Sequence, residues 1–175
     1  ARLTVSDVYQ RIKPREDPPL PVRIVDIGDA SLEQYGQWPW PRTVLADLVD
    51  RLVANGAAAI VFTMLFPEPD RTSPGRAIEV WPETPMVRLL ENSVKELPDH
   101  DALFAEAIAT APVVLGFAAT SSQTRRPPTF SGGMAFAGQD PTGVLPRVGG
   151  GLTSIEVIDQ AAWGRGGLLL TKDVD

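Results

Sequence analysis

The sequence has no cysteine and a single histidine, His100. Without cysteine the chain forms no disulfides and has no thiolate chemistry, and one histidine without cysteines makes a poor zinc site. Basic residues are also few, because 16 Lys and Arg stand against 22 Asp and Glu, for a net charge of −6. The basic surface that nucleic-acid binding needs is therefore missing, and an anionic membrane surface would weakly repel the chain.

Long apolar runs are absent as well. No stretch reaches the roughly 18 apolar residues that suggest a membrane-spanning helix. Residues 1–20 carry charges throughout, lack the apolar segment of a signal peptide, and are broken by prolines, so we expect them to be a linker. The 175 residues, 43% hydrophobic and 22% charged, suit one folded domain with a buried core.

The stretch from Val22 to Asp70 is the centre of the predicted fold. Val22–Ile27 is rich in β-branched residues and predicts a buried strand. Apolar residues then recur with helical spacing from Leu45 to Val53, and Gly56 supplies the end of that helix. Ala57–Phe66 is almost wholly apolar, which is typical of a central strand covered on both faces. Together these elements predict a right-handed βαβ unit with two parallel strands.

Further elements alternate along the rest of the chain. Residues 67–83 and 120–151 are rich in proline or glycine and are expected to be loops. A loop as long as the second is either functional or mobile, and the mobile reading is favoured. One helix should begin at Thr84 and Pro85 and carry the apolar stripe Met86, Leu89, Leu90, Val94 and Leu97. A second should be capped by Asp101, with Leu103, Phe104, Ala107 and Ile108 inside; a third should start with a capping box of Thr153 and Glu156, bury Ile155, Ile158 and Ala162, and end at Gly164–Gly167. Strands are expected at Val113–Ala118 and Leu168–Thr171, and a short edge strand at Met134–Ala137.

This alternation of strands and helices indicates the α/β class. It predicts a mostly parallel sheet flanked by helices on both faces. The spacing of the apolar residues does not determine the order of the strands in that sheet.

Four carboxylates, Asp26, Asp29, Glu68 and Asp70, lie near the carboxyl ends of the first two predicted strands. The carboxyl edge of such a sheet is where ligands bind, and oxygen ligands of this kind suit Ca²⁺ or Mg²⁺. A metal-dependent hydrolase is one reading. The other is that Asp29 caps a turn and that the remaining acidic residues are solvated loop charges.

The turn Trp38-Pro39-Trp40-Pro41 precedes Arg42 at the predicted start of the helix. Its prolines stiffen the chain, and its rings either pack over the sheet edge or form an aromatic wall for a ligand. We expect Trp40 to be mostly buried. A cation at a helix N-terminus opposes the helix dipole, so Arg42 should pair with the carboxylate of Asp29 or of the Glu68–Asp70 segment, unless an anionic ligand binds there.

His100 lies between Asp99 and Asp101 and is expected at the surface. No G-x-S-x-G element accompanies it, so a nucleophilic triad is not indicated. Residues Gly149–Gly151 lack the spacing of a dinucleotide-binding loop and are a weak phosphate-loop signal. We therefore expect no catalytic residues, no metal and no cofactor in this chain.

Several motifs resemble the second class of CHASE domains, the extracytoplasmic sensors of bacterial adenylate or guanylate cyclases and histidine kinases. The resemblance covers most of the chain from Val22 onward, with one departure at Thr63, where the family usually has an acidic residue. The matching segments are IVDIGDASL at 24–32, GQWPWPR at 36–42, NGAAAIVF at 55–62, LFPEPD at 65–70, HDALFAEAIATAPVVLGF at 100–117 and LTSIEVIDQAAWGRGGLLLTKDVD at 152–175.

The resemblance implies a sensor domain over residues 21–175, preceded by a linker from a membrane anchor and incomplete at its C-terminus. It implies a place on the extracytoplasmic side of the bacterial inner membrane, anchored by segments outside this chain. The signal would be a small molecule or an environmental condition, and we expect a homodimer in the full-length receptor. A purely structural dimerisation module remains an alternative. The candidate ligand-binding residues are Asp29, Ser31, Trp38, Trp40, Arg42, Glu68 and Asp70.

Overall fold

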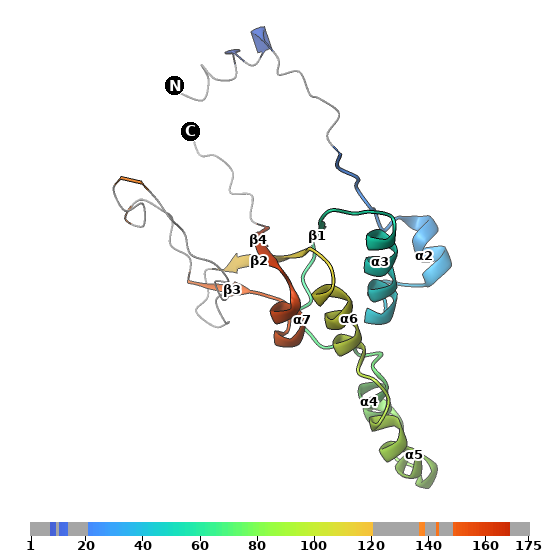
Figure 1. The fold of residues 1–175 in the computed structure, drawn as a ribbon. Coiled ribbons are helices and arrows are strands. Elements are labelled where there is room, and N and C mark those ends of the chain that lie inside the picture. The colour runs from blue at the N-terminus through green and yellow to red at the C-terminus, as the bar shows by residue number, and fades with distance from the viewer. Residues whose placement is uncertain are drawn as a thin grey trace. The chain divides into compact units, whose positions relative to one another are not determined.

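The computed structural model describes residues 8–9, 11–13, 21–120, 137–138, 143 and 149–168 (Figure 1). The chain divides into two compact units. The first unit comprises residues 1–38 and 170–175, and the second comprises residues 39–169.

In the first unit the predicted strand at Val22–Ile27 is wrong. The segment carries no strand, and Ile24 is 92% exposed. A strand forms only where a neighbour satisfies its N–H and C=O groups, and no described strand pairs with this one. The residues between this segment and the turn at 38–41 form helix α2, Asp29–Tyr35, where no helix was expected. Helix α2 ends at Gly36, whose φ is +86°. Such a positive φ favours glycine.

The second unit begins with helix α3, Arg42–Ala54, where the apolar spacing predicted one. Its buried face contains Leu45 and Val49. The predicted stop is confirmed, because Gly56 has a φ of +83° and its N–H donates to the carbonyl of Val53. A residue with a Cβ would be strained in that conformation.

The sheet is mixed rather than mostly parallel. Strand β2, Val113–Thr120, is its centre, and it pairs in parallel with β1, Ile60–Phe62, and with β4, Gly164–Gly167. The far end of β2 pairs antiparallel with β3, Gly150–Leu152. The prediction for Val113–Ala118 is confirmed. The expected strand at Ala57–Phe66 shortens to three residues and has β2 as its one described neighbour.

The sheet buries one face at β1. Ile60 and Phe62 point into the core, whereas Val61 on the opposite face is 63% exposed. The rings of Phe62, Phe66 and Phe104 meet edge to face, with centroids 5.2–5.7 Å apart, an arrangement that adds to the burial of each ring. The expectation of helices on both faces therefore fails at this strand.

Two helices complete the core. Helix α6, His100–Ala109, packs against α3 and against α7, Glu156–Ala161. The residue that caps α6 is Asp99, not Asp101, and its Oδ1 accepts from the backbone N–H groups of residues 101 and 102. The predicted capping box of Thr153 and Glu156 is also absent, since α7 begins after Ile155 without a side-chain cap.

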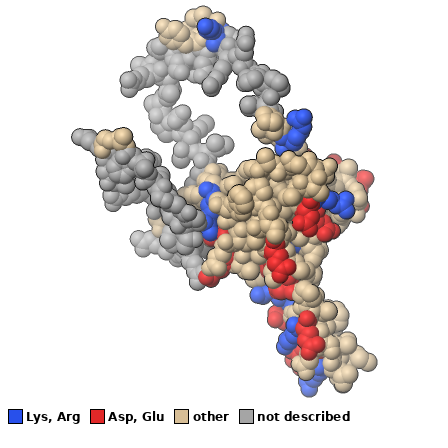
Figure 2. Space-filling view, in the orientation of Figure 1, with Lys and Arg blue, Asp and Glu red and all other residues tan. Residues whose placement is uncertain are grey.

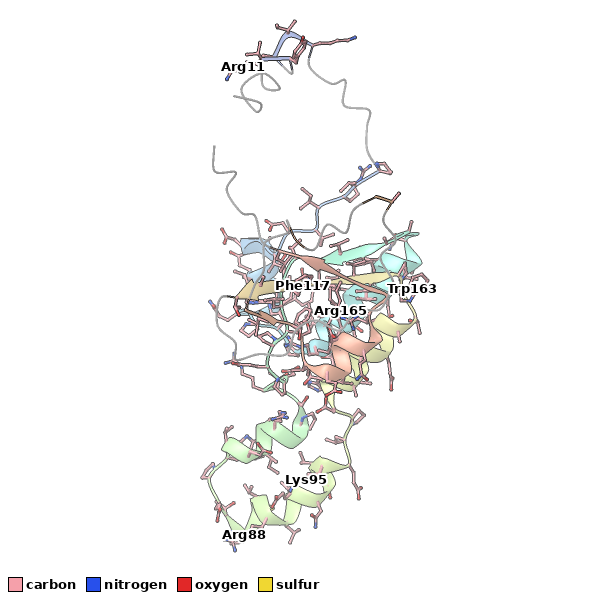
Figure 3. The ribbon with its side chains drawn as sticks, turned by 90° about the vertical axis from the view of Figure 1, so that its left-hand side faces the viewer. Arg11, Arg88, Lys95, Phe117, Trp163 and Arg165 are labelled. Atoms are coloured by element: carbon pink, nitrogen blue, oxygen red, sulfur yellow. The ribbon has the colours of Figure 1, made fainter. Side chains whose placement is uncertain are left out.

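Between β1 and α6 the chain forms an excursion over residues 71–99, which we call the arm. It contains α4, Pro74–Ala77, the short helix η1, Ile78–Val80, and α5, Pro85–Lys95. The loop expected at 67–83 is thus partly helical. The start of α5 is as predicted, because Thr84 Oγ1 accepts a 3.2 Å hydrogen bond from the N–H of Val87. Figures 1 and 3 both show the arm extending from the end of α6.

Strand β4 lies where a helix end was predicted. It has the sequence Gly-Arg-Gly-Gly, and the small residues allow close packing. A Cβ added at Gly116 on the paired strand would lie only 2.5 Å from Leu168 Cδ1. The predicted mobile loop at 120–151, the edge strand at 134–137 and the strand at 168–171 fall largely outside the described residues.

Candidate functional site

A buried ion pair joins the first turns of α3 and α6. Arg42 and Asp101 are both almost fully buried, and Nε of Arg42 lies 3.3 Å from Oδ1 of Asp101. The two atoms are not aligned for a hydrogen bond, and neither makes one to any other atom of the described chain. The attraction is therefore mainly electrostatic, at a place where water screens it little.

The sequence places these charges there because each lies on the buried stripe of its helix. Arg42 precedes Leu45 and Val49 by three and seven residues, and Asp101 precedes Phe104 and Ile108 by the same steps. Residues at this spacing share one helix face. Since α3 packs on α6, the two stripes bring the opposite charges together inside the protein.

Arg42 makes two further contacts in the loop that follows β1. Its Nη2 donates a 3.2 Å hydrogen bond to the backbone carbonyl of Glu68, and its guanidinium carbon lies 4.6 Å from the centre of the Phe66 ring. A cation over an aromatic face is attracted by the ring's quadrupole. The guanidinium is thus held by an anion, a carbonyl and a ring at once.

Asp70 lies next to this pair and accepts hydrogen bonds on both oxygens. Its Oδ2 accepts from the backbone N–H of Arg42 at 2.7 Å. Its Oδ1 accepts from the backbone N–H and the hydroxyl of Thr72 at 2.8 and 2.7 Å. Asp70 thereby satisfies an N–H at the start of α3 that no helical carbonyl can reach.

The two ends of the arm meet at four residues that we call the neck, namely Asp70, Ser73, His100 and Asp101. The backbone N–H of Asp70 donates to Asp101 Oδ2 at 2.8 Å, and that of His100 donates to Ser73 Oγ at 2.9 Å. Nδ1 of His100 lies 3.3 Å from Asp70 Oδ2. The chain therefore leaves the core and returns to it through one hydrogen-bonded junction.

The neck carboxylates differ in their affinity for protons. Burial acts to raise the pKa of Asp70, but hydrogen bonds from the backbones of Arg42 and Thr72 outweigh it and lower the pKa below its ordinary value. Burial also raises the pKa of Asp101, and here it exceeds the opposing effects of the Asp70 N–H and the Arg42 charge. Asp70 is thus the better stabilised anion.

The structure brings together only part of the predicted site. Arg42, Asp70 and a backbone oxygen of Glu68 meet. The carboxylate that pairs with the Arg42 guanidinium belongs to Asp101 rather than to Asp29 or the Glu68–Asp70 segment, from which Asp70 accepts only the backbone N–H of Arg42. Trp40 is buried, as predicted, at 6% exposure. Asp29, Ser31 and Trp38 belong to the first unit, where Asp29 is exposed, Ser31 is half-buried and Trp38 is 38% exposed.

Sequence reasoning missed Asp101 as a site residue and wrongly put His100 at the surface. His100 is partly buried and lies 3.2 Å from the Thr72 hydroxyl as well as near Asp70. A signal was present for Asp101, since a carboxylate in register with a buried apolar stripe requires a buried partner. Sequence reasoning also did not single out Arg165 of β4 (Figure 3), whose Nε donates to Asp159 Oδ1 at 2.8 Å.

Chemically, the neck can hold charge and respond to protons. Within the described residues, no group of three or more His, Cys, Asp or Glu side chains is placed to hold a metal ion. The site offers an ion pair and a hydrogen-bonded junction. In the same part of the chain, no helix is both long and apolar enough to cross a membrane.

The family model for the CHASE2 domain matches residues 1–172, which is nearly the whole chain. No curated protein and no solved structure matches the sequence significantly. Because the family model covers far more than half of the chain, the protein belongs to the CHASE2 domains, a family of extracellular sensory domains.

Proposed function

We propose that this chain is the sensory part of a membrane-bound bacterial receptor, on the extracytoplasmic side of the inner membrane. Its family membership over residues 1–172 is the observation that carries the proposal. Membrane-spanning segments outside this chain would pass the signal to a cytoplasmic adenylate or guanylate cyclase or to a histidine kinase. The domain itself senses and does not catalyse.

The neck supports this role, because it is the point through which a change in the core would reach the arm. A ligand shifts a receptor only to the extent that it binds one state more tightly than the other. Arg42, Asp70, His100 and Asp101 are coupled by an ion pair and hydrogen bonds. A signal that rearranges one of these side chains must therefore disturb the others.

The test uses the full-length receptor in its membrane. Cyclase or kinase output is measured while pH, osmolarity and small metabolites are varied, first for the intact receptor and then after in-frame deletion of residues 21–168. We expect the output of the deleted receptor to stay constant under conditions that change that of the intact one. Retention of the same responses after the deletion would overturn the proposal.

A thermal-shift screen of the 175-residue chain against metabolites and ions separates a ligand sensor from a structural module. A ligand that binds the folded state alone raises the melting temperature by mass action. Extracytoplasmic placement is tested separately with the full-length variant Asn92→Cys, in which any cysteine outside these 175 residues is first replaced by Ser; the 175 residues themselves contain none. We expect a membrane-impermeant maleimide to label it in intact spheroplasts. Labelling only after lysis would contradict the placement.

A further inference from the structure

The arm exposes an apolar surface that the rest of the chain does not cover. On α5 the exposed large apolar residues are Met86, Leu89 and Leu90, and Leu97 follows just after the helix. Met86 is 66% exposed and Leu89 is 78% exposed. The spacing that predicts this helix normally marks a buried face. An apolar face left open on a folded protein marks an interaction site.

Met86, Leu89 and Leu90 lie on one side of α5 at 100° per residue, and the exposed Ser93 of that side separates them from Leu97, which follows the helix. The neighbouring Val87 and Val94 are half-buried, and the main contacts of α5 are with α4 and η1. The charged side lies opposite, where Arg88 pairs with Glu83. We call the four residues Met86, Leu89, Leu90 and Leu97 the α5 strip.

We propose that the α5 strip is a self-association surface, on which the arm of a second copy of this chain packs. The proposal concerns association alone, and it holds or fails independently of the signalling role. In a two-fold dimer the same patch is used on both copies. A straight apolar strip on a helix meets that requirement, since two such strips can lie against each other with their charged sides outward.

The exposed area fits such a dimer. Val80 and Trp81, just before the helix, are also exposed, so the exposed apolar area of the arm is of the same order as the about 800 Å² that each partner buries in an interface of standard size. Met86 and Trp81 belong to the residue types that interface cores favour. The arm alone therefore supplies nearly the area that each copy would need.

The charges of the arm favour a second copy over a lipid surface. Residues 71–99 contain basic and acidic side chains in nearly equal number, and Figure 2 shows both kinds close together on the arm. In the ion pairs Arg88–Glu83 and Lys95–Glu91, opposite charges neutralise each other within one copy. A helix that lies on a membrane instead carries an excess of Lys and Arg on its polar side, and the whole chain has a charge of −6.

The neck makes the arm a suitable place for such an interface. Hydrogen bonds between Asp70 and Asp101 and between Ser73 and His100 fix both ends of the arm to the core. A surface held at both ends loses less conformational entropy on association than a free tail does.

The first test is sedimentation equilibrium of the 175-residue chain. We expect a reversible dimer whose dissociation constant rises at least about tenfold in Leu89→Glu, because the two-fold axis brings two new like charges together. Lys95→Gln is the control, since it lowers the net charge by the same single unit on the opposite, exposed side of α5. Circular dichroism verifies that both variants are helical. A monomeric wild-type chain, or equal weakening by both substitutions, would overturn the proposal.

A second test does not require that a charge be tolerated in the strip. The variants Leu89→Cys and Lys95→Cys, the second on the opposite side of α5, each contain one cysteine in an otherwise cysteine-free chain. Under mild oxidation we expect Leu89→Cys to form covalent dimers at least about ten times faster, because the strip places two copies of residue 89 near each other. Equal rates would contradict the proposal. So would binding to phosphatidylglycerol vesicles that Leu89→Glu abolishes, which would assign the strip to lipid.

Discussion

The backbone N–H of Asp70 donates a 2.8 Å hydrogen bond to the side chain of Asp101, a residue 31 positions further along the chain. Two carboxylates, which would repel each other in isolation, are thereby joined through a main-chain donor. Arg42 completes the arrangement by placing its own N–H on Asp70 and its guanidinium beside Asp101. One residue at the start of α3 thus contacts both acids, through its backbone N–H and through its charge.

The ion pair gives the first prediction. Arg42→Met should lower the free energy of unfolding by about 3–5 kcal/mol, because it leaves Asp101 as an uncompensated buried charge. The double variant Arg42→Met/Asp101→Asn should regain part of the lost free energy of unfolding, because Asn keeps an acceptor for the Asp70 N–H without carrying a charge. Urea denaturation of the double-mutant cycle measures the coupling. The control is Arg51→Met, an exposed position of the same helix, and a loss there equal to that of Arg42→Met would refute the prediction.

Asp70 gives a prediction about pH. Its pKa is lowered in the folded state, so its contribution to stability is fully present above the unfolded value of about 3.9 and is lost as pH falls through the folded pKa. We expect Asp70→Asn to be less stable than the wild type by about 1–3 kcal/mol at pH 7. The difference should shrink as pH falls below about 4. Thermal melts of both proteins from pH 7 to pH 2.5 measure it, and a difference independent of pH would exclude the carboxylate as its source.

The two tryptophans of the aromatic turn should respond unequally. Trp40 is 6% exposed and Trp38 is 38% exposed. Truncation of Trp40 to Ala should cost about 3–5 kcal/mol, as for other buried large side chains, and Trp38→Ala should cost clearly less. Chemical denaturation of both variants tests this comparison, and a larger loss at Trp38 would reverse the assignment of Trp40 to the core.

Two glycines should respond to the same substitution with opposite signs. Gly116→Ala should destabilise by about 1–3 kcal/mol, because the new Cβ would lie 2.5 Å from Leu168 Cδ1. Gly75→Ala, in α4 with no atom within 4 Å of its new Cβ, should instead stabilise by about 0.4–1 kcal/mol. Adding Leu168→Ala to Gly116→Ala should relieve the clash. The prediction is tested by the melting temperatures of the wild type, Gly116→Ala, Gly75→Ala and the double variant Gly116→Ala/Leu168→Ala. A double variant no more stable than Gly116→Ala would mean that the new methyl group clashes with a residue other than Leu168.

The sequence predicted the helices better than the sheet. The spacing of Leu45 and Val49, and of Phe104 and Ile108, marks the buried sides of α3 and α6 because helical periodicity is a local property of the chain. A strand depends on a neighbour that the local sequence does not name. Val22–Ile27 has the composition of a strand but no described partner, whereas the Gly-Arg-Gly-Gly of β4 has no such composition and pairs with β2.

The candidate site was predicted only in part for a related reason. The position of Arg42 at a helix start indicated that it needed an anion, but several acids were near enough in sequence to serve. The choice of Asp101 depends on the packing of α3 against α6, which brings together residues 59 positions apart. Similarly, the apolar stripe of α5 was identified correctly as a stripe, but periodicity does not show whether the chain itself covers it.

The closed neck also affects how the protein tolerates changes in length. The two ends of the arm are hydrogen-bonded to each other. The length of the arm therefore affects the stability of the core only through the entropy of closing a loop, and doubling the length of such a loop costs only about 0.6 kcal/mol. Insertions or deletions within the arm should therefore leave the sheet and its helices intact. The sequence of the arm can therefore change in length and composition during evolution, and with it the contacts that the arm makes, while the core keeps its fold.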